Sequence, residues 1–73
     1  MKVSIYSKEH KVLVDKIKQA RIEAKLGQEE AAKLLGTTQS YISKLESGQR
    51  QVNALQLKEL ANLYKKSVSY FFK

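Results

Sequence analysis

The chain has 73 residues, with no cysteine, no proline and a single histidine. A chain of this length forms one domain and buries only about 60% of the surface that its unfolded form exposes, which leaves no room for a deep catalytic cleft in a second lobe. Without cysteine there is neither a disulfide framework nor a thiolate zinc site, and the lone His10 cannot build a metal site without carboxylates. We therefore expect no bound metal and no cofactor.

The charge of the chain is strongly positive. Fourteen Lys and Arg residues stand against seven Asp and Glu, which gives a net charge of +7. Such a balance in one small domain is typical of a protein that binds nucleic acid, although a lysine-rich surface that is merely solvated is the alternative. No run of about 18 apolar residues is present, so we expect a soluble, intracellular protein with no membrane partner.

The first predicted element is a helix that begins at the N-cap Ser7 and runs to about Lys25. Its apolar positions recur with the helical period and comprise Leu13, Val14, Ile17, Ala20 and Ala24. Arg21 is a charged residue on this otherwise apolar face. Residues 1–6 precede the helix, and their sequence assigns them no role.

Two short helices follow, over residues 28–35 and 39–47. Gly36 is expected to end the first in the left-handed conformation that glycine adopts most easily, and Gly48 to end the second in the same way. Thr38 is the expected N-cap of the second helix. Because the connection between them is so short, the two helices must form a tight corner.

The last predicted elements are a helix over residues 54–64, capped by Asn53, and a short helical turn over residues 68–73, capped by Ser67. The sequence contains no convincing strand pattern. It therefore predicts an all-α fold, a compact domain of five helices over residues 7–73.

The second helix of the corner has two different sides. Its apolar residues Ile42 and Leu45 fall together, whereas the opposite side carries Gln39, Ser40, Ser43 and Lys44. Hydrogen-bonding side chains of these kinds read base edges and bind phosphate in the major groove of DNA. An ordinary solvated helix face would look the same, so this pattern leaves both interpretations open.

The spacing around the corner resembles the helix-turn-helix of phage repressor and Cro-like regulators, the xenobiotic-response-element type. Positions 1, 5, 9, 15 and 18 of that motif match Gln28, Ala32, Gly36, Ile42 and Leu45, and the flanks "LGQEEAAKLLG" and "ISKLESG" match as well. The resemblance covers residues 12–72. It implies a lambda-repressor-like domain with its helix-turn-helix at about 28–47, acting as a transcriptional repressor on DNA in a bacterial or phage-encoded setting, in the cytoplasm or nucleoid.

The sequence departs from the family pattern at a few positions. Lys25 stands where the family usually has glycine, Gly27 where it has a Thr or Ser cap, and Ala31 where it has a larger apolar residue. Lys65 and Lys66 replace a Gly-Val pair. The first three departures concern the expected boundaries of the second helix, and the last concerns the angle of the terminal turn and the dimerisation inferred from it.

The resemblance also implies which residues read bases. Gln39 matches the position that reads a base in the phage repressors, and a glutamine amide can bond adenine N6 and N7 together. Ser40 and Lys44 match further base-facing positions. Thr38 lies where its methyl or hydroxyl group can reach the groove or the backbone.

A second set of residues is implied to contact phosphates. Gln28 matches the family's phosphate-binding residue at the start of the first corner helix, and Ser43 can bond phosphate or merely cover the helix. Gln49 and Arg50 fall in the loop that approaches the sugar-phosphate backbone, and a guanidinium group suits phosphate. For these loop residues the alternative is simple solvation.

One further pair has a structural role in the family. An arginine on the first helix is paired there with a glutamate late in the reading helix, and this chain has Arg21 and Glu46 in those places. We expect this ion pair to fix the reading helix against the first helix. Phosphate is a possible secondary contact.

An enzyme is disfavoured, because no catalytic triad, shielded carboxylate pair or phosphate-binding glycine loop can be assembled from this composition. The serious alternative is an antitoxin or adaptor whose main partner is another protein and which represses its own operon. A double-stranded DNA partner with an inverted repeat, bound by a homodimer, is our main expectation. The predicted dimer interface consists of the terminal side chains Val68, Tyr70, Phe71 and Phe72.

Overall fold

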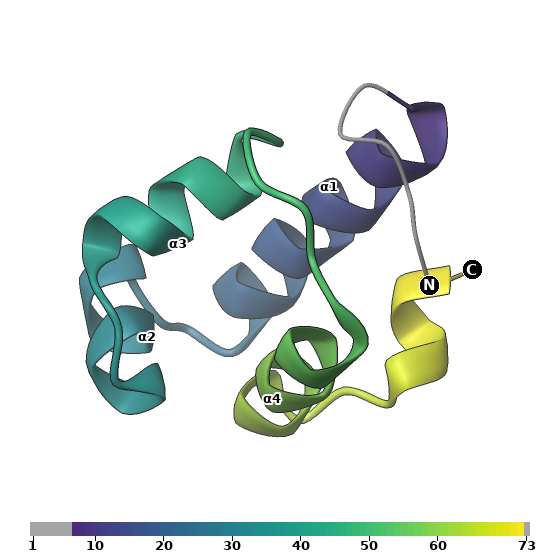
Figure 1. Cartoon of the computed structure of the whole chain (residues 1–73). Helices are drawn as coiled ribbons and strands as arrows, with labels where there is room; N and C mark the ends of the chain where they lie inside the picture. The colour runs from purple at the N-terminus through teal and green to yellow at the C-terminus, as the bar shows by residue number, and fades with distance from the viewer. Residues whose placement is uncertain (1–6, 73) are drawn as a thin grey trace.

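The structure is a computed structural model, and it describes residues 7–72. Four α-helices and a terminal 3-10 helix follow one another along the chain: α1 (Lys8–Glu23), α2 (Gln28–Leu35), α3 (Gln39–Glu46), α4 (Ala54–Tyr64) and η1 (Val68–Phe72) (Figure 1). The predicted all-α class is confirmed, with the difference that the fifth element is a 3-10 helix. The N-terminal segment 1–6, to which the sequence assigned no role, lies outside the described residues.

Three helices begin where capping side chains predict. The side-chain oxygens of Ser7, Thr38 and Asn53 each accept a hydrogen bond from the backbone N–H three residues further on, at 3.0, 3.1 and 2.7 Å. These bonds satisfy backbone donors that the first turn of a helix leaves without partners. Ser67 differs: its hydroxyl lies 3.0 Å from that of Ser69, and its carbonyl accepts from Tyr70 N–H at 3.1 Å.

The helix ends are less regular than the sequence suggests. Gly36 adopts the predicted left-handed conformation with φ of 72°, and Gly48 does so with φ of 86°. Lys25 and Lys65 are also left-handed, with φ of 61° and 57°, although side chains disfavour this region. As a result α1 ends at Glu23, two residues before the predicted boundary.

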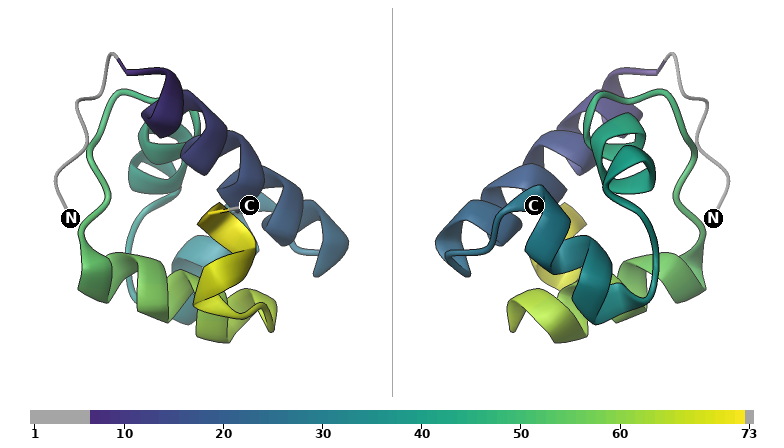
Figure 2. Two further views of the ribbon diagram at one scale, coloured as in Figure 1. Left: turned by 90° about the vertical axis from the view of Figure 1, so that its right-hand side faces the viewer. Right: turned by 90° about the vertical axis from the view of Figure 1, so that its left-hand side faces the viewer.

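The helices enclose one core. Apolar side chains from all of the elements meet there, and the buried set comprises Leu13, Val14, Ile17, Ala20, Ala31, Ala32, Ile42, Leu45, Val52, Leu57, Leu60, Ala61, Tyr64 and Phe71. α2 and α3 form the corner at one side of the molecule, and α1 packs against both α3 and η1. The 3-10 helix η1 lies between α1 and α4, as the turned views show (Figure 2).

The side chains of the predicted dimer interface on η1 differ in their exposure. Phe71 is 1% exposed and belongs to the core, while Val68 and Phe72 are 43% and 54% exposed. Tyr70 is half-buried, with its ring at right angles to that of Phe71 and 5.1 Å from it. Phe71 and Phe72 follow one another in the helical turn and so point in different directions, Phe71 into the core and Phe72 towards the surface.

Two lysines and a glutamate tie η1 and its connection to α1. Lys66 Nζ lies 2.6 Å from Glu23 Oε1 at the end of α1. The ammonium groups of Lys16 and Lys66 lie 5.2 and 4.7 Å from the centre of the Tyr70 ring. Cations at these distances are attracted to an aromatic face. The C-terminal segment is therefore attached to α1 by charge as well as by the burial of Phe71.

Candidate nucleic-acid interface

The corner between α2 and α3 is closed by short backbone contacts. Thr37 N–H donates to the carbonyl of Ala32 at 2.8 Å, and Gly36 N–H donates to that of Lys33 at 3.1 Å. Ala32 is almost fully buried, so its small side chain lets α2 and α3 approach each other. Ile42, on α3, is buried as well. The corner thus holds α3 by one side and leaves its other side exposed.

The exposed side of α3 and its N-cap carry the residues that the sequence proposed as base readers, together with one proposed phosphate contact. The readers Thr38, Gln39, Ser40 and Lys44 and the phosphate contact Ser43 are all exposed. Apart from the cap made by Thr38, their side chains form no hydrogen bond or ion pair with residues 7–72. This face therefore presents a row of free donors and acceptors on a helix that is rigidly held from behind.

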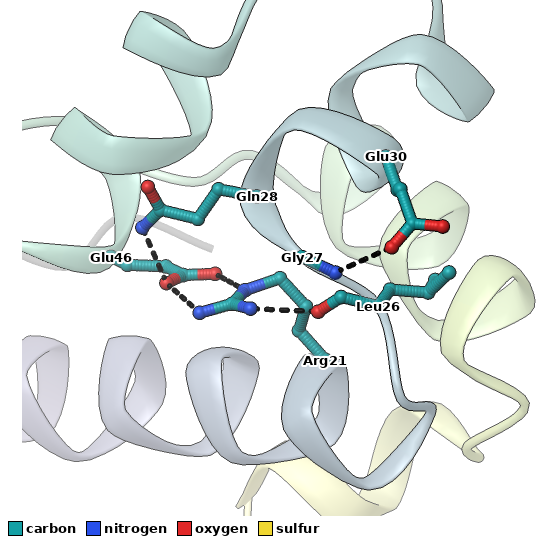
Figure 3. Close-up of polar contacts among 6 residues, drawn as sticks. All are labelled: Arg21, Leu26, Gly27, Gln28, Glu30 and Glu46. Carbon is teal, nitrogen blue, oxygen red and sulfur yellow. Dashed lines mark hydrogen bonds and ion pairs between the residues drawn. The ribbon is translucent and has the colours of Figure 1, made fainter.

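A buried ion pair fixes the end of α3 (Figure 3). Arg21 Nε donates to Glu46 Oε2 at 2.7 Å and Nη2 donates to Oε1 at 3.1 Å, while Nη1 donates to the carbonyl of Leu26 at 2.8 Å. The two side chains are 10% and 3% exposed. The hydrogen bonds that Arg21 donates to Glu46 raise the pKa of Arg21 more than burial lowers it. Arg21 therefore stays charged and joins α1, the connection after it and α3.

Gln28 belongs to the same network. Its side-chain Nε2 donates to Glu46 Oε1 at 3.1 Å, so its amide is held over the end of α3 (Figure 3). The amide nitrogen has a second N–H, and neither that group nor the amide oxygen bonds any of residues 7–72. Next to it, Gly27 N–H donates to the Glu30 carboxylate at 3.1 Å, which supplies a cap that glycine lacks.

The loop after α3 turns back over the helix end. Gln49 N–H donates to the carbonyl of Lys44 at 3.0 Å, and the Gln49 amide donates to the Ser47 hydroxyl at 3.0 Å. Arg50 is exposed, and its guanidinium carbon lies 5.1 Å from the centre of the Tyr41 ring. The loop is thus folded onto α3, with the side chain of Arg50 against the reading helix.

Two cations beside this face, Lys44 and Arg50, lack an ion pair within residues 7–72, and the negative charge of Glu59 acts on Tyr41 next to Arg50. The three ion pairs found within residues 7–72 are Lys11 with Asp15, Arg21 with Glu46 and Lys66 with Glu23. Lys44 and Arg50 take part in none of them, so their charges are not neutralised by residues of the described chain. Positive charge placed beside exposed hydrogen-bonding groups suits a polyanion.

Sequence reasoning missed two features near this surface. It gave no role to Tyr41, whose ring contacts Arg50. It assigned no structural place to His10, which is 1% exposed and whose Nε2 has no partner among residues 7–72. An aromatic residue followed nine positions later by a loop arginine is a weak pattern, and only the turn at Gly48 brings the two together.

Other kinds of site are not seen in the described part of the chain. Within residues 7–72 no three His, Cys, Asp or Glu side chains are grouped so as to hold a metal ion. No helix there is both long enough and apolar enough to cross a lipid bilayer.

The comparison with protein families gives a clear result. The family model described as "Helix-turn-helix" matches residues 17–71, which include all of the corner, α4 and nearly all of η1. No curated protein and no solved structure matches the chain. A family match over most of the chain, together with the geometry of α2 and α3, establishes the assignment. The chain belongs to the Cro/C1-type helix-turn-helix family, whose members are DNA-binding transcription regulators rather than enzymes.

Proposed function

We propose that this regulator binds duplex DNA sequence-specifically as a homodimer and represses transcription, with α3 in the major groove. Gln39, Ser40 and Lys44 are the proposed base readers, and Thr38 is a further contact at the groove edge. A Gln amide fits the N6 and N7 edge of adenine. The proposed place of action is the bacterial or phage-encoded cytoplasm, where such a protein meets genomic DNA.

The observation that carries the proposal is the exposed face of α3. Its polar side chains have no partners among residues 7–72, although the helix itself is fixed by its buried face and by the pair of Arg21 and Glu46. Free side chains on a rigid helix supply donors and acceptors without the cost of ordering the backbone that carries them. A merely solvated face would not need such fixing.

The proposed phosphate contacts surround this face. Gln28 offers its free amide N–H at the start of α2, and Arg50 and Gln49 lie in the loop after α3. Ser43 is the fourth member of the set and lies on α3 itself. Contacts of this class position the protein on the duplex, whereas base contacts select the sequence.

Selection of bound sequences from a random DNA pool tests the proposal. We expect the purified chain to enrich one defined site. Gln39→Ala should then lose a factor of about 5 to 150 in discrimination at one base pair, which corresponds to about 1 to 3 kcal/mol. Asn62→Ala on α4 is a matched amide control, because Asn62 is exposed and lies outside the corner. Enrichment of no sequence, or an unchanged preference in Gln39→Ala, would remove α3 as the reader.

A protein partner is a second candidate, in keeping with an antitoxin or adaptor that also represses its own operon. It is favoured by exposed apolar side chains: Leu34 and Leu55 are 64% and 67% exposed, and Phe72 is 54% exposed. Leucines of this exposure are more typical of contact surfaces when they gather in a patch. If the purified chain alone binds its selected site tightly, DNA rather than a protein is its primary partner.

A further inference from the structure

The geometry points to Tyr41 as a positioning residue, whose ring holds the Arg50 guanidinium at the edge of the exposed face of α3, where it can bind a DNA phosphate. This inference rests on the proposed function, because it assigns a cause to one of the proposed phosphate contacts. It gives Tyr41 a role that packing alone does not require.

The contact between the two side chains is direct. The guanidinium carbon of Arg50 lies 5.1 Å from the centre of the Tyr41 ring, within the range of about 6 Å at which a cation is attracted to an aromatic face. Tyr41 is itself held, because its partly buried ring packs against the core cluster. Burial raises the pKa of its hydroxyl, so the ring is neutral at neutral pH. A fixed neutral ring is thus in contact with a mobile cation.

Arg50 needs such a support. It is exposed, it lies in a loop between α3 and α4, and it forms no ion pair with residues 7–72. A free arginine side chain has many rotamers, and each must be given up when the side chain binds a partner. Contact with Tyr41 reduces that loss in advance. The five N–H donors of a guanidinium lie in its own plane, so contact with a ring leaves donors for phosphate.

The position of Tyr41 on α3 strengthens the argument. On a helical wheel with about 100° per residue, Gln39 and Lys44 lie at the two ends of the exposed arc of α3. Tyr41 lies just beyond Lys44, at one border of that arc. Glu46 lies at the opposite border, next to Gln39, and holds Gln28. A side chain that is held in place and can donate a hydrogen bond to a phosphate therefore lies at each border of the exposed face. A helix in the major groove has one sugar-phosphate backbone on either side, which is the arrangement that such a pair of donors fits.

The experiment measures affinity for the selected site over a series of salt concentrations. Arg50→Ala should reduce the slope of log affinity against log salt by about one, because one phosphate contact is lost. Tyr41→Leu keeps the apolar volume and removes the ring, and we expect it to weaken binding by about two- to fivefold. Tyr41→Phe keeps the ring and should bind like the parent. In an Arg50→Ala background, Tyr41→Leu should have no further effect on affinity.

The unfolding midpoint of each variant in urea shows whether the fold itself is weakened. If Tyr41 had a purely structural role, Tyr41→Leu would lower DNA affinity equally with and without Arg50. Equal affinity of Tyr41→Leu and the parent would overturn the inference, as would an equal loss in the Arg50→Ala background. Tighter binding by Tyr41→Leu would show that the ring holds Arg50 away from DNA, which also overturns it. In all three cases the parent still selects a site, so the proposed function survives; selection of no site would overturn both.

Discussion

A few side chains join the end of α3 to α1 and α2. Glu46 accepts from both Arg21 and Gln28, so removing Arg21 or Glu46 disturbs the whole group. An ion pair with little exposure is not necessarily a net stabiliser, because taking two charges out of water is costly. Removing only one partner is clearly unfavourable, however, because the remaining charge stays buried without compensation.

Arg21→Ala should therefore destabilise the fold by about 3 to 5 kcal/mol, as measured by urea unfolding followed by circular dichroism. Arg50→Ala is the matched control, since Arg50 is exposed and in no ion pair with residues 7–72, and it should unfold like the parent. The double variant with Arg21→Met and Glu46→Leu should be destabilised less than Arg21→Ala, because no charge is left alone. A parent-like midpoint for Arg21→Ala would contradict the importance of the pair.

Tyr64 offers a test of burial in the core. Its side chain is 2% exposed, and its hydroxyl has no hydrogen-bond partner among residues 7–72. An unpartnered buried hydroxyl costs free energy, so Tyr64→Phe should raise the free energy of unfolding by about 1 kcal/mol at neutral pH. Ile17→Val, at a fully buried position, is a core control that should instead lower it.

The same tyrosine should make stability depend on alkaline pH. Burial, aided by the negative charge of Glu46, raises the pKa of Tyr64 from 10.0 to about 12. Between these values the unfolded chain loses the tyrosine proton and the folded chain keeps it, so stability falls as pH rises from about 10 to about 12. Below pH 10 this contribution is constant. The stability advantage of Tyr64→Phe over the parent should grow across that window in urea titrations, and an advantage independent of pH would contradict the shift.

At the scale of elements, the sequence was informative where local chemistry decides the structure. The caps Ser7, Thr38 and Asn53 and the turn glycine Gly36 act through bonds to residues a few positions away, so they can be read from the chain itself. The direction of the Phe71 side chain could not be predicted from the sequence in this way, because a 3-10 turn and an α-helical turn place the same side chain in different positions.

Two helix ends are strained by their lysines. Lys25 and Lys65 have positive φ, where a β-carbon costs about 1 to 2 kcal/mol. Lys25→Gly and Lys65→Gly should each raise the free energy of unfolding by about 1 kcal/mol, because the relief of strain exceeds the extra entropy of the unfolded glycine. Lys33→Gly, inside α2, is the matched control and should lower it. Thermal unfolding of the three variants measures these changes. Destabilisation by Lys25→Gly would show that contacts of the lysine side chain outweigh the backbone strain.

At the scale of the whole molecule, one copy of α3 can read only a few base pairs. A genome offers roughly 10⁶ to 10⁹ competing sites, so the proposed specificity requires a second copy. Sequence alone assigned four terminal side chains to the contact between copies, and burial of Phe71 in the core reduces that set. Whether a side chain at the chain end is part of the core or faces outward depends on how η1 lies between α1 and α4, which no local pattern specifies.

The exposed terminal side chains Val68 and Phe72 remain in the proposed dimer interface. A two-fold axis through that interface predicts an inverted repeat in the selected DNA, with half-site centres about 10 base pairs apart, so that both copies of α3 enter the groove on one side of the duplex. A double variant with Val68→Ser and Phe72→Ser should keep the helical circular dichroism of the parent. Its binding to the full site should lose cooperativity, while binding to an isolated half-site should be unchanged.

Phe71→Ala is the control that separates assembly from folding. Its side chain is buried, so this change should lower the free energy of unfolding by about 3 to 5 kcal/mol and weaken binding to full sites and half-sites alike. Ultracentrifugation on the selected DNA gives the number of bound copies directly. Two parent copies per inverted repeat, and a shift towards one in the double variant, would support the dimer interface at η1. One copy on a site without inverted symmetry would contradict the homodimer, and the protein-partner function would then be the better account of the exposed apolar residues.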